Sequence, residues 1–263
     1  MSEAGDAAWT SRNDGMNPYY RAAYSWGKDL RINANIVAYL KAYNDPRLSK
    51  YATTASSSIH TGDYIGVYPG TANGEDDRNC LDLSNIKIGE NDPQLIMSAA
   101  EASFLEAEAA LLGWWTKNTA KELYVNGISI SMQERGCDMG NYLDTMSPGN
   151  IQYNNGNNSG TISNVPAVKA DVTPTLQQII TQKWLANFPN GWETWADIRR
   201  TGFPNLLPAV KTNSKAGVNS IKEMRRLTFS TNEYNTNEEN VKVAVGMLKD
   251  PADAFTSRLW WQQ

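Results

Sequence analysis

The chain has 263 residues, of which 41% are hydrophobic and 20% charged, and its formal net charge at pH 7 is -4. A chain of this length can bury a sizeable core, which excludes the disulfide-dense miniproteins. The absence of a basic excess excludes DNA and RNA as partners, because nucleic-acid affinity depends largely on cationic side chains. The single histidine, His60, and the two cysteines, Cys80 and Cys137, do not have the clustered spacing of a metal site.

The start of the chain resembles no targeting segment. Residues 1–8 contain neither a basic region nor an apolar run, and no later stretch reaches the roughly 18 apolar residues that a membrane helix needs. We therefore expect this chain to be soluble by itself, with any leader of the natural protein outside it.

Helical periodicity dominates the first half of the chain. Apolar residues at three- and four-residue steps predict a helix over residues 29–43, which the Asn-Asp-Pro sequence after it ends. Residues 49–92 form a connection so long that we expect it to be functional. Asp92 as N-cap and the proline after it then predict a long alanine-rich helix over 92–115. A second helix over 118–134 completes an antiparallel hairpin of tetratricopeptide type.

The second half contains further helices separated by polar segments. Residues 147–172 are rich in Asn and Gly, which predicts an irregular excursion. Thr173 and the proline after it predict the start of the next helix, and two more helices are expected over 192–200 and 235–248. The predicted fold class is therefore mainly α, with tetratricopeptide-like helical hairpins joined by long irregular loops in one domain over residues 1–263.

Two carboxylates, Glu101 and Glu108, fall within an apolar stripe of the long predicted helix. Burial of an unpaired charge costs several kcal/mol, so we expect structural ion pairs, with Arg199 and Arg200 as the foremost partners. The alternative is an acid/base pair for glycoside hydrolysis. A spacing of seven residues corresponds to about 10.5 Å of helix rise, which is long for either separation of catalytic carboxyls.

The aromatic residues are 9 Trp and 12 Tyr against only 5 Phe, a bias toward rings with a polar group. Flat exposed rings flanked by amides and charged groups suit sugar binding. The loop from 61 to 85 offers this combination, and Asn17, Tyr19 and Tyr20 near Trp26 offer a second one. The residues expected to bind ligand are Trp26, Tyr64, Tyr68, Asn73, Asp77, Arg78 and Asn79.

Two other interpretations concern neighbouring residues. The carboxylates of Glu75, Asp76 and Asp77 could alternatively hold Ca²⁺ through oxygen ligands, although EF-hand spacing is missing and no cofactor is otherwise indicated. Trp192 and Trp195 share a helix face, and we expect them to form a core stripe rather than to touch ligand.

A series of blocks in fixed order resembles a known family. The blocks are NDPRL at 44–48, AEA at 107–109, NGI at 126–128, QKWLANFPNGWETWADIRRTGFPNLLP at 182–208, RRLTF at 225–229, and NTNEENV followed by TSRLWW near the end. Together they are similar to the C-terminal half of SusD/RagB-type proteins, the surface glycan-binding lipoproteins of Bacteroidota. One departure is Ser230, where the family pattern leads us to expect a proline in a turn.

The resemblance implies a helical scaffold at the cell outer membrane that packs against a SusC-like TonB-dependent transporter and binds oligosaccharide without catalysis. It also implies that the N-terminal half and the lipoprotein signal lie outside this chain. Two alternatives remain open: a helical-barrel glycoside hydrolase, and a tetratricopeptide-like scaffold that binds a partner protein.

Overall fold

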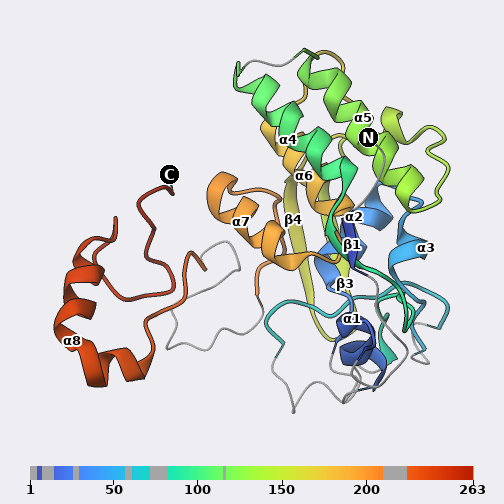
Figure 1. The fold of residues 1–263 in the computed structure, drawn as a ribbon. Coiled ribbons are helices and arrows are strands. Elements are labelled where there is room, and N and C mark those ends of the chain that lie inside the picture. Colours follow the sequence, from blue (N-terminus) through green and yellow to red (C-terminus); the bar gives the residue numbers. More distant parts are fainter. Residues whose placement is uncertain are drawn as a thin grey trace.

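The structure is a computed structural model, and it describes residues 5–7, 15–25, 30–56, 61–71, 82–114, 117–209 and 224–262. Its regular structure is mainly helical, which confirms the predicted fold class (Figure 1). The helices are α1 (Pro18–Tyr20), a π-helical turn (Arg21–Ser25), α2 (Ala34–Ala42), α3 (Leu48–Tyr51), α4 (Ala99–Leu111), α5 (Ala120–Glu134), a 3-10 turn (Tyr142–Asp144), α6 (Leu176–Ala186), α7 (Gly191–Thr201) and α8 (Thr231–Gly246). Strands of the described residues pair antiparallel, β1 (Gly5–Ala7) with β2 (Gln94–Met97) and β3 (Gly149–Asn154) with β4 (Ser159–Val165).

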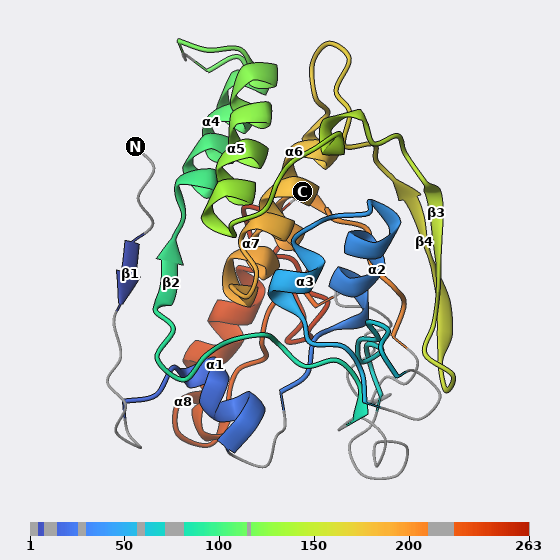
Figure 2. The ribbon, with the colours of Figure 1, turned by 90° about the vertical axis from the view of Figure 1, so that its right-hand side faces the viewer.

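The predicted helical hairpin is formed by α4 and α5, which lie side by side in both ribbon views (Figure 1, Figure 2). The Ser98 hydroxyl accepts a hydrogen bond from the Glu101 amide at 2.9 Å, and Thr119 begins α5 with a capping box. Gly127 allows the close approach of the two helices, because a Cβ at this position would lie 2.9 Å from the Phe104 ring.

The long helix begins later than predicted. Residues 94–97 form β2, which pairs with β1, and α4 begins only at Ala99. Asp92 is not its N-cap. The Asp92 carboxylate instead accepts a hydrogen bond from the Gly89 amide at 2.7 Å and closes a turn. A short apolar run such as Leu95 to Met97 is compatible with helix or strand, and pairing with a distant segment decided the outcome.

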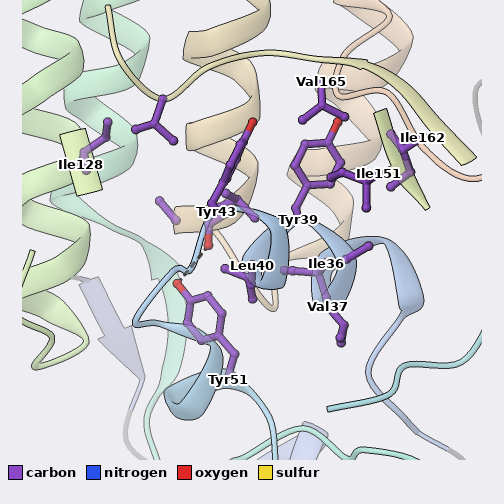
Figure 3. Close-up of a cluster of buried hydrophobic side chains, with 14 of the residues drawn as sticks. Ile36, Val37, Tyr39, Leu40, Tyr43, Tyr51, Ile128, Ile151, Ile162 and Val165 are labelled. Atoms are coloured by element: carbon purple, nitrogen blue, oxygen red, sulfur yellow. Dashed lines mark hydrogen bonds between the residues drawn. The ribbon is translucent and has the colours of Figure 1, made fainter. Parts of the chain in front are cut away.

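The core is built around α2. The predicted stripe residues Ile36, Val37 and Leu40 are buried, and Figure 3 shows them with Tyr39 and Tyr43 among the apolar side chains of the β3–β4 hairpin. Because most residues of α2 are buried, this helix is covered on nearly all sides rather than along one stripe. α2 is therefore a central element against which the other elements are placed.

The expectation of an irregular excursion over 147–172 was wrong, because much of this segment forms the β3–β4 hairpin. Inward residues of β3, Ile151 and Tyr153, alternate with exposed ones, as a half-buried strand requires. At the turn, the Asn155 carboxamide oxygen accepts hydrogen bonds from the amides of Asn157 and Asn158. The asparagines thus form the turn, and their abundance concealed the alternation in the sequence.

The later helices follow their predicted order with small shifts. Thr175, rather than Thr173, caps α6, and its capping box includes Gln178. α7 ends at Gly202, which has a φ of 78° and so suits a helix C-terminus. Ser230 caps α8 through a hydrogen bond from the Glu233 amide at 3.3 Å, which gives the departure from the family pattern a structural role.

The C-terminal segment, residues 224–262, lies to one side of the helical body (Figure 1). Within α8 only Val241 is buried, and the segment meets α7 through the indole N–H of Trp195, which donates to the Met224 carbonyl at 3.0 Å. None of the helices that the structure describes combines the length and the apolar character needed to cross a bilayer.

Candidate functional site

The structure corrects the role predicted for Tyr68. The Tyr68 side chain is only 2% exposed, and its ring lies 6.3 Å from that of Tyr153, at a tilt of 44°. A Cβ on Gly160 would lie 2.0 Å from the Tyr68 hydroxyl oxygen, so only glycine leaves room there. Burial also raises the pKa of the phenol above its ordinary value. Tyr68 is therefore a core residue, and its ring is not available for a ligand.

Tyr64 is half-buried and packs against the core cluster, with part of its ring open to solvent. The other residues expected to bind ligand lie outside the described residues, namely Trp26, Asn73, Asp77, Arg78 and Asn79. The alternative Ca²⁺ cluster at 75–77 lies outside them as well. Among the residues that the structure describes, no group of three or more His, Cys, Asp or Glu side chains could hold a metal ion.

Next to Tyr64 lies a groove of about 540 Å³ between α2, residues 63–65 and β3, which we call the polar groove. Residues of α2 and of β3 line two sides of this groove. Figure 2 shows α2 beside the β3–β4 hairpin. Asn150, Gln152 and Asn154 are exposed and share one face of β3, because alternate strand residues point the same way. The sequence analysis missed these three residues because it assigned the segment to an irregular excursion.

Each of these carboxamides uses its oxygen within the hairpin. Asn150 accepts a hydrogen bond from the Asn164 amide, Gln152 from the Thr161 hydroxyl, and Asn154 from the Gly156 amide, at distances of 3.3, 2.7 and 2.7 Å. The carboxamide NH₂ groups have no acceptor among the described residues. These NH₂ groups are therefore held in place and can donate hydrogen bonds to the oxygen atoms of a ligand.

The opposite wall of the polar groove carries an ion pair. The Lys41 ammonium donates to both carboxylate oxygens of Asp63 at 2.8 and 2.9 Å, and the two side chains are 40% and 51% exposed. Such an exposed pair contributes little to stability. Its cation and its anion line the same groove as the three amides, and both kinds of charged group can bind hydroxyls.

The two buried carboxylates of α4, those of Glu101 and Glu108, are held in ion pairs. The Lys183 ammonium lies 3.6 Å from the Glu101 carboxylate and 2.9 Å from that of Asp197. The sequence analysis expected an arginine for Glu101, and the structure corrects this to a lysine of α6. Burial raises the pKa of the Glu101 carboxyl above its ordinary value, although Lys183 opposes this shift.

Arg200 and Arg199 have different roles. Both Glu108 carboxylate oxygens accept hydrogen bonds from Arg200, which also pairs with Asp197 at 2.9 Å. These bonds raise the pKa of the Arg200 guanidinium. Arg199 makes no ion pair with the described residues, which corrects the expectation for it. Its guanidinium lies 3.9 Å from the Trp195 ring centroid and 5.3 Å from that of Trp261.

A fully buried polar cluster was not recognised in the sequence. The side chains of Asp45 and Arg47 are both 0% exposed and pair at 2.6 Å. Arg47 also donates to Ser131, Tyr142 and Gln182 at 2.9, 3.1 and 3.2 Å. All hydrogen bonds of this cluster are satisfied within the fold, so it ties α3, α5 and α6 together rather than offering a binding site.

The tryptophans of α7 are not the core stripe that was expected. Trp192 is 74% exposed, and Trp195 is half-buried. Both line a cavity of about 420 Å³ that also includes Tyr19 of the second aromatic set. The helix pattern correctly placed the two rings on one face, but the spacing alone did not tell whether that face was covered.

The comparisons with known proteins agree with this architecture. The family model of SusD-like proteins, described as Susd and RagB outer membrane lipoprotein, matches residues 1–262. A SusD homologue from Bacteroides uniformis is 34% identical, with a TM-score of 0.85 over 98% of this chain and 56% of that chain. A chitin-binding SusD homologue from Flavobacterium johnsoniae is 35% identical, with a TM-score of 0.81 over 95% of this chain and 53% of its own.

No curated protein matches the chain. The chain spans about half the length of the solved structures that it resembles, including a SusD-like protein from Bacteroides thetaiotaomicron at 34% identity and 53% of its length. The ordered blocks, the helical architecture and the match over nearly every residue lead to one assignment. The chain belongs to the SusD-like family of SusD and RagB outer-membrane lipoproteins.

Proposed function

We propose that this chain contributes to non-catalytic binding of oligosaccharide at the cell surface. The observation that carries the proposal is the polar groove, whose lining combines the amides of Asn150, Gln152 and Asn154 with the ion pair of Lys41 and Asp63. Sugar hydroxyls both donate and accept hydrogen bonds, so they can use amides, a cation and a carboxylate together. The chitin-binding relative from Flavobacterium johnsoniae makes β-linked N-acetylglucosamine oligomers the first ligands to test.

The arrangement of carboxylates favours binding over hydrolysis. Glycoside hydrolysis generally requires two carboxyl groups that flank the bond to be cleaved. Asp63 is the carboxylate of the polar groove among the described residues, and it is paired with Lys41. Glu101 and Glu108 are held in their own ion pairs within the helical body. Among the residues that the structure describes, the groove therefore offers the hydrolase alternative no pair of unpaired carboxylates.

Isothermal calorimetry with a panel that includes chitohexaose, cellohexaose and maltohexaose tests the proposal. We expect one class to bind, and Gln152→Ala to weaken that binding. Gln133→Ala is the matched control, because Gln133 is an exposed amide on α5 outside the groove. If the wild-type chain binds none of the three hexasaccharides, the proposal is contradicted. Release of reducing ends that Asp63→Asn abolishes would establish the hydrolase instead.

The second part of the proposal concerns the partner. We infer from the family that the full-length protein works with a TonB-dependent transporter in nutrient uptake, with the helical hairpins as the scaffold. Co-purification of the full-length protein with the transporter from outer membranes tests this. A protein that binds glycan but never co-purifies with a transporter would disprove the partner and leave the glycan binding intact.

A further inference from the structure

A second groove, on another part of the molecule, joins a polar cavity to an aromatic one. The polar cavity, of about 230 Å³, lies among α1, α3, residues 86–95 and the end of α5. The aromatic cavity, of about 420 Å³, lies beside α7. Tyr19 and Pro189 line both cavities, so the two adjoin and form one groove, which we call the composite groove. In Figure 2, α1 lies beneath α7.

The aromatic end contains one fixed and one freely exposed indole ring. The Trp195 ring is fixed on two sides, by its hydrogen bond to the Met224 carbonyl at 3.0 Å and by the Arg199 guanidinium over its face. The Trp192 ring lies 6.0 Å away at an angle of 60° and is 74% exposed. Two rings at this angle form an open aromatic corner.

The polar end contains cations held in defined positions. The Arg135 guanidinium donates to the Phe188 carbonyl at 2.8 Å and lies 5.0 Å from the centroid of the Tyr51 ring. Lys87 donates to the Ser49 carbonyl at 3.0 Å. Lys50 is exposed and lines the same cavity, and its ammonium has no partner among the described residues. The end of the groove away from the indoles therefore offers several N–H donors.

The chemistry of the two ends fits one kind of molecule. A pyranose ring has an apolar C–H face that can stack on an indole, and a rim of hydroxyls that needs hydrogen bonds. A purely apolar ligand or a helix face would cover the Lys50 ammonium, which has no partner among the described residues, and burial of an unpaired charge is unfavourable. Surfaces that bind a helix are typically lined by aliphatic side chains, whereas this groove combines indole rings with cations.

We propose that the composite groove binds an oligosaccharide, with one pyranose stacked on Trp192 in the corner that Trp195 closes and the adjoining sugars hydrogen-bonded by Lys50 and Lys87. This inference rests on the proposed glycan-binding function and assigns a second binding site for it, separate from the polar groove. The exposed indole supplies affinity, and the two lysines at the opposite end of the groove set the direction of the bound sugar chain.

The test uses the 263-residue chain, the same three hexasaccharides, and the variants Trp192→Ala and Trp192→Phe. We expect Trp192→Ala to weaken binding of the recognised hexasaccharide by about tenfold or more, as truncation of a central aromatic anchor does. Trp192→Phe should recover part of the affinity because it keeps a ring. Lys50→Gln should weaken binding by a smaller factor. Circular dichroism verifies that each variant is folded.

Trp260→Ala is the matched control, because Trp260 is 83% exposed and does not line the groove. If the wild-type chain binds a hexasaccharide and Trp192→Ala binds it equally well, the composite groove is not a binding site, while the proposed function stands. If the wild-type chain binds none of the three, both proposals fail. If Trp192→Ala changes the molar mass in light scattering instead of glycan affinity, the corner is a protein contact and the inference is overturned.

Discussion

The tyrosine-rich core around α2 and the tryptophan-bearing surface of α7 use aromatic residues in opposite ways. The core buries seven tyrosines, each at most 6% exposed, namely Tyr39, Tyr43, Tyr51, Tyr68, Tyr124, Tyr142 and Tyr153. On the surface, Trp192 and Trp260 are 74% and 83% exposed. The sequence analysis had expected the reverse for Tyr68 and Trp192. Residue type alone therefore does not tell whether an aromatic ring is buried or exposed.

Six of the seven buried hydroxyls have a hydrogen-bond partner, and only that of Tyr68 has none among the described residues. Those of Tyr39, Tyr43, Tyr51 and Tyr124 donate to the backbone carbonyls of Asn205, Pro166, Leu185 and Val168, at distances between 2.7 and 2.9 Å. Three of these four carbonyls belong to connecting segments that have no helical or strand hydrogen bonds of their own. The rings thus fill the core. Their hydroxyls donate hydrogen bonds to backbone carbonyls of the long loops and so hold these loops in place.

The most disruptive test of the core is Arg47→Met. The substitution leaves the fully buried Asp45 carboxylate without its cation, and the loss of one partner from a buried pair typically costs about 3–5 kcal/mol. We expect the free energy of unfolding to fall by that amount in a urea titration. Lys117→Met, at an exposed position between α4 and α5, serves as the control. If the Arg47→Met variant is as stable as the wild-type chain, the buried cluster does not stabilise the fold.

Removal of a single buried hydroxyl should lower the free energy of unfolding by less than the loss of Arg47. Tyr124→Phe keeps the ring but leaves the Val168 carbonyl without its donor, which should cost about 1–3 kcal/mol. Tyr64→Phe is the matched control, because the Tyr64 hydroxyl has no bonding partner among the described residues, and we expect its stability to stay within about 0.5 kcal/mol. Thermal unfolding of the two variants compares them directly. Equal melting temperatures would mean that the hydroxyls do not hold the loops.

These examples also show what the sequence could reveal. The ends of α5 and α7 were predicted within two residues of those observed, whereas α2 begins at Ala34 and not at residue 29 as predicted. Local signals were enough there because a helix satisfies its backbone by itself. The β3–β4 hairpin was missed because its exposed positions and its turn use the same asparagines that mark loops.

The candidate sites were harder to predict than the helices. Arg47 joins residues that are 84 and 135 positions away along the chain, and no local pattern brings those together. The segment around Tyr64 and Tyr68 has no regular period, so the sequence gives no sign of which tyrosine faces inward. The polar groove and the composite groove each combine residues from segments far apart in the chain, and only the fold reveals them.

The C-terminal segment beside α7 should respond to acid in a way that the tyrosine core does not. Burial by itself would raise the pKa of Asp253, but hydrogen bonds from Arg226, Tyr234 and the Phe229 amide outweigh it and hold that pKa below its ordinary value. A lowered native pKa contributes stability above the unfolded pKa, and this contribution is lost as pH falls through the native value.

We therefore expect hydrogen exchange in residues 224–262 to increase on acidification below about pH 4, the unfolded pKa of an aspartate, before exchange in α2 does. Asp253→Asn should show faster exchange of this segment already at pH 7 and should remove most of its dependence on pH. Exchange that increases in α2 and in the segment at the same pH would show that the segment does not loosen separately.

The smallest effect on stability is expected at the exposed ring of α7. Trp192→Ala removes an indole that is 74% exposed and makes no hydrogen bond to the described residues, so the free energy of unfolding should change by no more than about 0.5 kcal/mol. Trp195→Ala, three positions along the same helix, removes the hydrogen bond to Met224 and the surface on which Arg199 stacks, and should cost clearly more. Urea titrations of the two variants measure the difference. Since the two residues differ in what they touch and not in type, a large loss for Trp192→Ala would mean that its ring supports the fold, and the contrast between core and surface would not hold.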